Sequence, residues 1–131
     1  MPERISWEQI NKTGNSLLSP AYKSNGHVFT SGSVGVDPVT GKIPEDLETQ
    51  AEIAIANLKH VLEKSGTSID KVLKVLLFIG HPSYAATVNK VYAKYFINKP
   101  ARSCVVVSFP NPNVKVEMEC IAEYEEIKTK L

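Results

Sequence analysis

The sequence lacks several features that are typical of particular classes of protein. Its 131 residues carry a net charge of only +1, which gives no field to attract nucleic acid or an anionic membrane. No apolar run reaches the ~18 residues of a membrane-spanning helix. Residues 1–11 have neither the hydrophobic core of a signal peptide nor the character of a transit peptide. These absences predict a soluble, cytoplasmic protein with no membrane partner and no strong affinity for nucleic acid.

Cysteine and histidine are scarce. The two cysteines, Cys104 and Cys120, both lie in apolar runs, which predicts buried reduced thiols rather than a disulfide. Neither they nor the three histidines show the spacing of a zinc site. The sequence therefore predicts no metal centre.

The remaining composition is that of an ordinary globular protein, with 43% hydrophobic and 22% charged residues. This length predicts a single domain over residues 1–131, large enough to bury about two-thirds of its unfolded surface. Apolar side chains at helical spacing predict one helix over residues 47–64, followed by Gly66 as a stop signal. A second helix is predicted over residues 83–96, with Ser83 as a candidate N-cap.

Strands are predicted around these helices in the order β-β-β-α-β-α-β-β. They cover residues 4–8, 26–30, 34–36, 72–79, 103–107 and 114–124. This order predicts an α+β sheet with two helices on one face, because two helices can cover only one face. The other face carries apolar residues such as Val105 and Val107, which predicts self-association. Residues 125–131 are predicted to form a charged tail.

Two neighbouring stretches near the C-terminus carry candidate chemistry. Four of the five residues at 103–107 are Cys or Val, which predicts a strand with little exposed surface, and residues 114–120 alternate between apolar and charged. A hairpin-like return between them is predicted to bring Arg102 close to Glu117. Arg102 could clamp a carboxylate and Glu117 could orient a water molecule. The alternatives are a salt bridge for Arg102 and the solvent side of an amphipathic strand for Glu117.

These stretches also carry a resemblance to a known family. Pro-Ala-Arg-Ser at residues 100–103 is followed by Val-Glu-Met-Glu at 116–119, and Thr-Ser-Gly at 30–32 and Ala-Thr-Val-Asn at 86–89 come earlier. With these motifs in this order, the chain resembles the YjgF / reactive-intermediate-deaminase (Rid) family. The resemblance implies a chorismate-mutase-like α+β fold. It also implies a homotrimer with a barrel-like core and ligand clefts between subunits.

The resemblance implies a role for each matched site residue. Arg102 and Glu117 take the positions of the family's carboxylate clamp and acidic residue, and Ser31, Gly32 and Asn89 take positions in the cleft wall. The alternatives are strand-end turn chemistry for Ser31 and Gly32 and an exposed helix position for Asn89.

The Cys104 position faces the ligand in the family through its backbone rather than its sulfur. As a side chain, Cys104 is predicted to be a buried small hydrophobe.

The implied activity is that of an enamine/imine deaminase, which hydrolyses small 2-imino acids to 2-oxo acids and ammonia. It needs no metal or cofactor, because an imine carbon is already electrophilic. One departure concerns a family tyrosine in the cleft, whose position here is Leu18, while Tyr22 could replace it only if the loop changes register.

This departure keeps a non-catalytic, metabolite-binding or interaction trimer open as an alternative. A ribonuclease or translation inhibitor is a further alternative, which the near-neutral charge disfavours.

Overall fold

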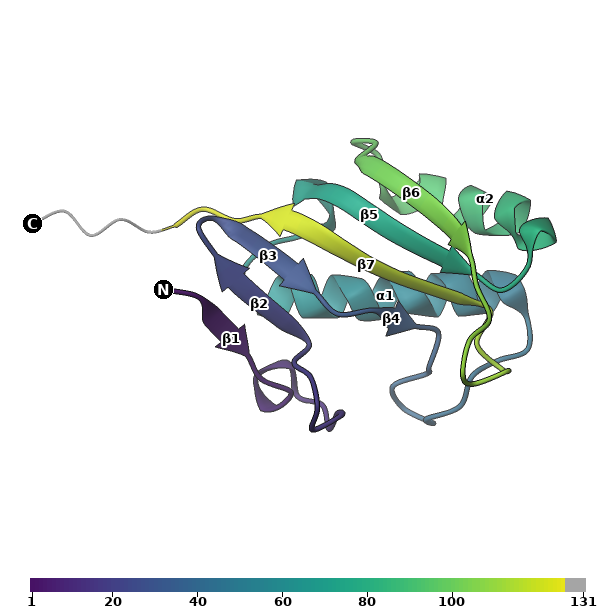
Figure 1. Ribbon diagram of the computed structural model, residues 1–131, viewed down its shortest axis with the longest axis horizontal. Coiled ribbons are helices and arrows are strands. Elements are labelled where there is room, and N and C mark those ends of the chain that lie inside the picture. The colour runs from purple at the N-terminus through teal and green to yellow at the C-terminus, as the bar shows by residue number, and fades with distance from the viewer. Residues whose placement is uncertain (127–131) are drawn as a thin grey trace, which may run out of the picture.

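The computed structural model describes residues 1–126, which form one mixed sheet with two helices on one of its faces (Figure 1). The strands lie in the order β1-β2-β3-β7-β5-β6, and β4 pairs with β7 beyond the end of β3. Their bounds are β1 Glu3–Ile5, β2 Ala21–Ser24, β3 His27–Thr30, β4 Ser33–Val34, β5 Val72–Ile79, β6 Ala101–Val106 and β7 Val116–Glu123. The α+β class and the single helix-covered face are therefore confirmed. Residues 127–131 of the predicted tail lie outside the described residues.

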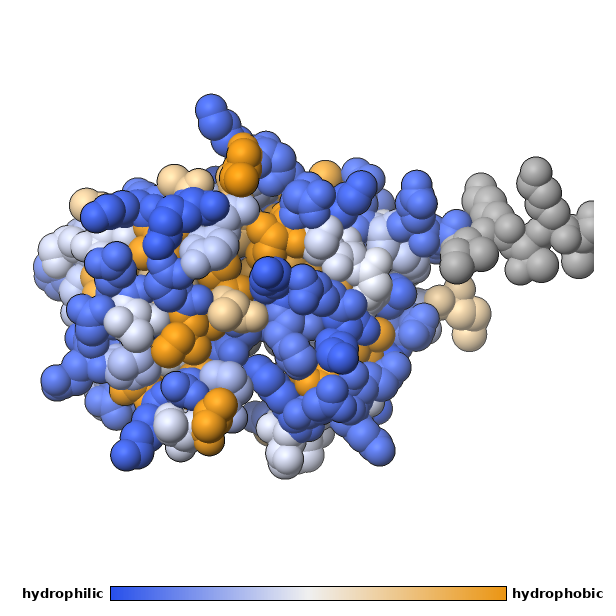
Figure 2. Space-filling view, turned by 180° about the vertical axis from the view of Figure 1, so that it is seen from behind, coloured by the Kyte–Doolittle hydropathy of each residue, from blue (hydrophilic) through white to orange (hydrophobic). Residues whose placement is uncertain are grey.

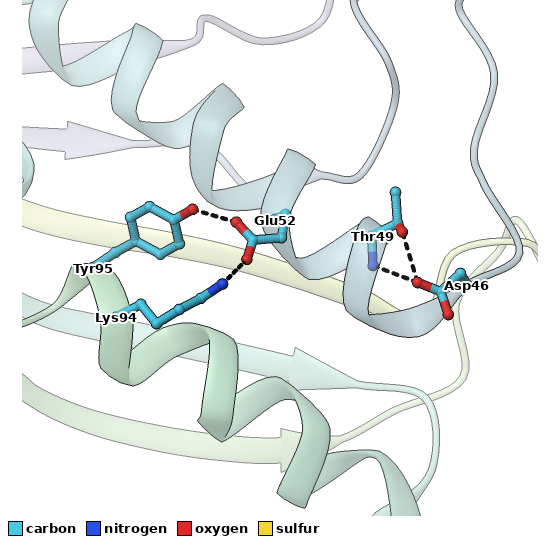
Figure 3. A network of polar contacts seen from close by, with 5 residues as sticks. All are labelled: Asp46, Thr49, Glu52, Lys94 and Tyr95. Carbon is cyan, nitrogen blue, oxygen red and sulfur yellow. Dashed lines mark hydrogen bonds and ion pairs between the residues drawn. The ribbon is translucent and has the colours of Figure 1, made fainter.

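The first helix, α1, has the predicted bounds, Leu47–Lys64. Asp46 caps it by accepting a hydrogen bond from the backbone N–H of Thr49 at 2.9 Å (Figure 3). The side chains that recur at helical spacing are buried against the sheet; they include Ala51, Ala54, Ile55, Leu58 and Leu62. The predicted stop is also observed, since Gly66 follows the helix with a φ of +91°.

The second helix, α2, covers Ala85–Tyr95 and is shorter than predicted. Ser83 does not cap it, because residues 82–84 form a separate 3-10 turn in which the His81 ring accepts a hydrogen bond from the Ser83 N–H. Glu52 of α1 accepts hydrogen bonds from both Lys94 and Tyr95 of α2 and so joins the two helices (Figure 3).

The N-terminal part of the sheet contains a hairpin that was not predicted. Strand β2 pairs with β3 through the turn at Asn25 and Gly26, whose φ values are +50° and +80°. Positive φ at both central residues favours the Asn-Gly pair in two-residue hairpins. The predicted first strand ends earlier than expected, at Ile5, because Trp7 leads into a 3-10 turn over residues 8–10.

The core lies between the helices and the covered face of β5 and β7. Its residues on these two strands are Val72, Val75, Leu77, Ile79, Val116, Met118, Cys120 and Ala122, and the N-terminal strands add Ile5, Ala21 and Val28. Cys120 is buried as predicted, and burial raises the pKa of its thiol to about 12. Within residues 1–126, no helix is long and apolar enough to cross a membrane.

Strand β6 contradicts two predictions. All six of its residues are exposed in the single chain, because β6 is an edge strand that pairs only with β5. Cys104 is therefore exposed rather than buried. The hairpin-like return is also wrong, because β5 lies between β6 and β7, parallel to the first and antiparallel to the second.

Candidate functional site

Arg102 lies on β6 and extends toward helix α2. Its Nη1 donates a hydrogen bond to Oδ1 of Asn89 at 2.8 Å, and its guanidinium carbon lies 4.7 Å from the centre of the Tyr92 ring. A cation over an aromatic face at an exposed site contributes about 0.5–1 kcal/mol. Among residues 1–126, no carboxylate lies within ion-pair distance of Arg102. The guanidinium is therefore held in place without a charged partner from the described part of the chain.

Tyr92 forms the platform under this guanidinium. Its ring stacks on Phe96 with 4.2 Å between ring centres. Its hydroxyl is buried and has no hydrogen-bond partner within the described residues. Burial raises the pKa of Tyr92, and the nearby charge of Arg102 partly opposes that shift. A neutral, packed ring of this kind restricts the positions that Arg102 can adopt.

Glu117 lies on β7 and is half-buried. Burial raises the pKa of its carboxyl, and the negative charge of Glu119 adds to the shift. A Cβ placed on Gly32 would lie only 2.7 Å from the carboxyl carbon of Glu117. The missing side chain at residue 32 therefore leaves the space that the Glu117 carboxyl occupies.

The Ser31 hydroxyl is used locally, since it donates to the carbonyl of Ser19 at 2.6 Å. The Ser31 N–H also donates to the carbonyl of Pro20 at 2.9 Å. These two bonds fix the segment that leads from Leu18 into β2. The next residue, Gly32, lies beside the Glu117 side chain.

Leu18 stays at the position that the resemblance assigns to the family's tyrosine. Leu18 is 45% exposed and its carbonyl accepts a hydrogen bond from Trp7 Nε1. Tyr22 stays in β2 opposite Phe29, which in turn pairs with Ile121, four residues along β7 from Glu117. The register change that would bring Tyr22 into the loop is therefore not observed.

The candidate residues form two groups on opposite faces of the sheet. Arg102 and Cys104 are in register with Val75 and Leu77, whose side chains face the helices. Glu117 is in register with Phe78, so it faces the open side. One group contains Arg102, Asn89 and Cys104, and the other contains Glu117, Gly32 and Ser31. A single chain does not bring the guanidinium and the carboxylate together, contrary to the prediction.

Tyr92 was not among the residues predicted for the site. The available signal was its spacing from Asn89, because residues three apart on a helix share one face. Both side chains contact Arg102 from α2. A polar residue and an aromatic residue at this spacing can together bind and orient a guanidinium.

Comparisons with known proteins identify the family to which this chain is similar. The family described as endoribonuclease L-PSP matches residues 13–124. Protein HMF1 of Saccharomyces cerevisiae is 44% identical over 105 residues, covering 79% of this chain and 81% of its own. The 2-iminobutanoate/2-iminopropanoate deaminase of Salmonella typhimurium is 38% identical over 99 residues, covering 72% of this chain and 77% of its own.

A solved structure has a similar fold and a related sequence. The crystal structure of E. coli TdcF with bound serine is 32% identical to this chain, with a TM-score of 0.85. The match covers 94% of this chain and 100% of that chain. A small amino acid is therefore bound by a protein that is similar along almost its whole length.

Proposed function

Because the chain belongs to the endoribonuclease L-PSP family, which is also the YjgF/Rid family, we propose that it hydrolyses small 2-imino acids to 2-oxo acids and ammonia. The observation that carries the proposal is the state of Arg102. Its guanidinium is oriented by Asn89 and Tyr92, yet no carboxylate among residues 1–126 pairs with it. A planar, positioned guanidinium is suited to bind the carboxylate of a substrate through two parallel hydrogen bonds.

Glu117 supplies the second group that the reaction needs. Its carboxylate accepts a proton from a water molecule as the water oxygen bonds to the imine carbon, and the electron pair of the C=N bond moves to nitrogen. Glu117 then returns this proton to nitrogen, which gives a carbinolamine that carries one hydroxyl and one amino group on the same carbon. Glu117 next moves the hydroxyl proton to the amino group, the oxygen forms the C=O bond, and the C–N bond breaks to release ammonia and the 2-oxo acid. The raised pKa of Glu117 suits this exchange, because it brings the carboxyl closer to neutral pH.

The two groups face opposite sides of one sheet, so we propose that a second copy of the chain completes the site. Strand β6 supports this proposal, because it is an exposed edge in which Val105 and Val106 keep 42% and 49% of their surface accessible. A homotrimer that buries this edge against the open face of the next copy brings Arg102 of one subunit toward Glu117 of its neighbour. Ser31, Gly32, Asn89 and Cys104 then line the cleft from the two sides.

Ammonia release from 2-iminopropanoate generated in situ tests the activity. We expect Arg102→Ala to lower kcat/KM by at least about 100-fold, because a charge-assisted contact to the substrate is lost. Lys90→Ala is the matched control, since Lys90 is an exposed cation on α2 outside the proposed site. If the Arg102→Ala variant hydrolyses the imine as fast as the wild type, the assignment is wrong.

A second candidate is a trimer that binds 2-oxo or amino acids without turning them over. Leu18 favours it, because a leucine stands where deaminating relatives are expected to place a hydroxyl in the cleft. Calorimetry with 2-oxobutanoate, beside the ammonia assay, distinguishes the two candidates. Arg102-dependent binding without turnover of any 2-imino acid supports this second candidate.

A further inference from the structure

A cleft outside the proposed catalytic groups opens on the helix-covered side of the molecule. It lies between the loop of residues 11–15, the loop of residues 34–41 and helix α1, and has a volume of about 1000 Å³. Figure 2 shows this hollow toward the lower edge of the helix-covered face. None of the candidate site residues lines it, so it is a separate feature of the chain.

The cleft combines an apolar wall with one cation. Val36, Pro38 and Ile53 supply much of the wall. The cation is Lys12, whose pKa is lowered because burial disfavours its charged form. Its ammonium makes one long hydrogen bond, to Oδ1 of Asn57 at 3.4 Å.

Lys12 has no acidic partner within residues 1–126. Asp37 lines the same cleft, but its Oδ1 accepts hydrogen bonds from the backbone N–H groups of Val39 and Thr40 at 2.8 and 3.2 Å. The Asp37 carboxylate is therefore already hydrogen-bonded within its own turn. A partly buried ammonium with one weak contact is a suitable partner for an anion from outside the chain.

Hydrogen bonds to backbone carbonyls hold the walls of the cleft in place. Asn57 Nδ2 donates to the carbonyls of Val34 and Val36, both at 2.9 Å. His60 Nε2 donates to the carbonyl of Ile10 at 2.6 Å, because a carbonyl can only accept. The three bonds connect α1 to the loop of residues 34–41 and to the 3-10 turn that leads into the loop of residues 11–15, so the hollow is a built part of the fold.

Trp7 forms the inner part of the N-terminal wall. Its Nε1 donates to the carbonyls of Asn15 and Leu18 at 3.0 Å. A Cβ on Gly14 would lie 2.1 Å from the indole, so the loop packs directly on this ring. A smaller cavity of about 120 Å³ shares Trp7 and Lys12 with the cleft and is itself lined by residues 31–33, so it adjoins Ser31 and Gly32 of the proposed site.

We propose that this cleft binds a small molecule that has one carboxylate and an apolar body. The carboxylate pairs with Lys12, and the hydrocarbon part lies against Val36, Pro38 and Ile53. The volume is in the range of small-molecule sites, which are mostly apolar with a few placed polar groups. The charge of Lys12 selects an anion over a neutral molecule of the same shape.

Titration with octanoate, followed by tryptophan fluorescence, tests the proposal. Trp7 is the only tryptophan of the chain and lines the cleft, so its emission reports binding there directly. We expect a saturable change with octanoate and an affinity at least about tenfold weaker for octanamide, which lacks the charge. Lys12→Met is expected to weaken octanoate binding about tenfold, while Lys59→Met, on an exposed part of α1, leaves it unchanged.

Two further variants test whether octanoate binds in this cleft or elsewhere on the chain. Ala56 is exposed at the cleft wall, so Ala56→Phe fills the hollow without disturbing the core and is expected to weaken octanoate binding. Arg102→Ala is expected to bind octanoate like the wild type, whether or not the deaminase assignment holds. The proposal is overturned if no saturable change occurs, if Lys12→Met or Ala56→Phe binds as tightly as the wild type, or if Arg102→Ala abolishes the signal.

Discussion

Strands β6 and β7 flank the same central strand, and each carries one of the two groups proposed to react. β7 is paired on both edges and buries every second residue, from Val116 to Ala122. β6 is paired on one edge only, and all its residues are exposed. Because the two strands are similarly apolar in sequence, their difference in burial arises from the elements that cover them. Because no part of residues 1–126 covers this apolar strand, we expect another copy of the chain to pack against it.

The same difference separates the electrostatics of the two groups. Glu117 is partly desolvated by burial, which raises the pKa of its carboxyl. Arg102 stands at an exposed edge and is oriented by α2 rather than by the sheet. The raised pKa of Glu117 thus arises within one chain, whereas under our proposal the surroundings of the Arg102 guanidinium are completed by a second copy packed against β6.

The largest effect on the free energy of unfolding is expected from a substitution on the buried strand β7. Met118 is fully buried on β7, so we expect Met118→Ala to lower the free energy of unfolding by about 2–5 kcal/mol. Val105→Ala, on β6, is expected to cost under about 0.5 kcal/mol in dilute protein. Its cost should grow with protein concentration, because association stabilises by mass action. Chemical denaturation at several protein concentrations measures both, and a concentration-independent loss for Val105→Ala contradicts the covered edge.

Substitution of the two glycines that flank β4 is expected to affect stability at one position and activity at the other. A Cβ on Gly35 would lie 2.5 Å from the carbonyl oxygen of Gln50 in α1, and backbone cannot move aside cheaply. We expect Gly35→Ala to destabilise by about 1–3 kcal/mol. A Cβ on Gly32 meets only the flexible end of Glu117. Gly32→Ala should therefore keep nearly the wild-type Tm but lower imine hydrolysis about tenfold; equal loss of Tm in both variants contradicts this distinction.

The smallest expected effect is on stability at Glu117. Its folded-state pKa is raised, so its contribution to stability is present at low pH and is lost as pH rises through the folded value. Glu117→Gln should therefore raise stability at pH 7, by under about 1 kcal/mol because the group is half-exposed. Thermal melts at pH 4 and pH 7 measure this: the gain should be present at pH 7 and absent at pH 4.

In the wild type, activity should fall on the acid side at a pH above the 4.5 that is usual for a glutamic acid, because a protonated Glu117 cannot accept a proton from water. The pH dependence of kcat/KM measures this. A profile that stays flat down to pH 4.5 contradicts the role of Glu117 as a base.

Much of the fold could be predicted from local patterns. Helix α1 and strand β5 have the predicted bounds, because an amphipathic stripe and a long apolar run are strong, self-contained signals. The hairpin at Asn25 and Gly26 was missed although the Asn-Gly pair is a specific turn signal. The exposure of β6 could not be read from its residues, because burial depends on which strands lie beside it.

The sequence identified the residues of the candidate site, but it did not predict on which faces of the sheet they lie. Motif resemblance selected Arg102 and Glu117, and each has surroundings that suit the proposed role. Their placement on opposite faces follows from the register of both strands on β5, at Val75 and Phe78. Register of this kind depends on long-range pairing, which the sequence of either strand alone does not specify.

The most direct test of the central claim is subunit complementation. Arg102→Ala and Glu117→Gln are each expected to be nearly inactive, and an equal mixture is unfolded and refolded together. If each site takes Arg102 from one copy and Glu117 from the next, about one quarter of the sites regain both groups, and ammonia release returns to about a quarter of the wild-type rate. A mixture that stays as inactive as its two components, although the copies exchange, contradicts a site shared between subunits.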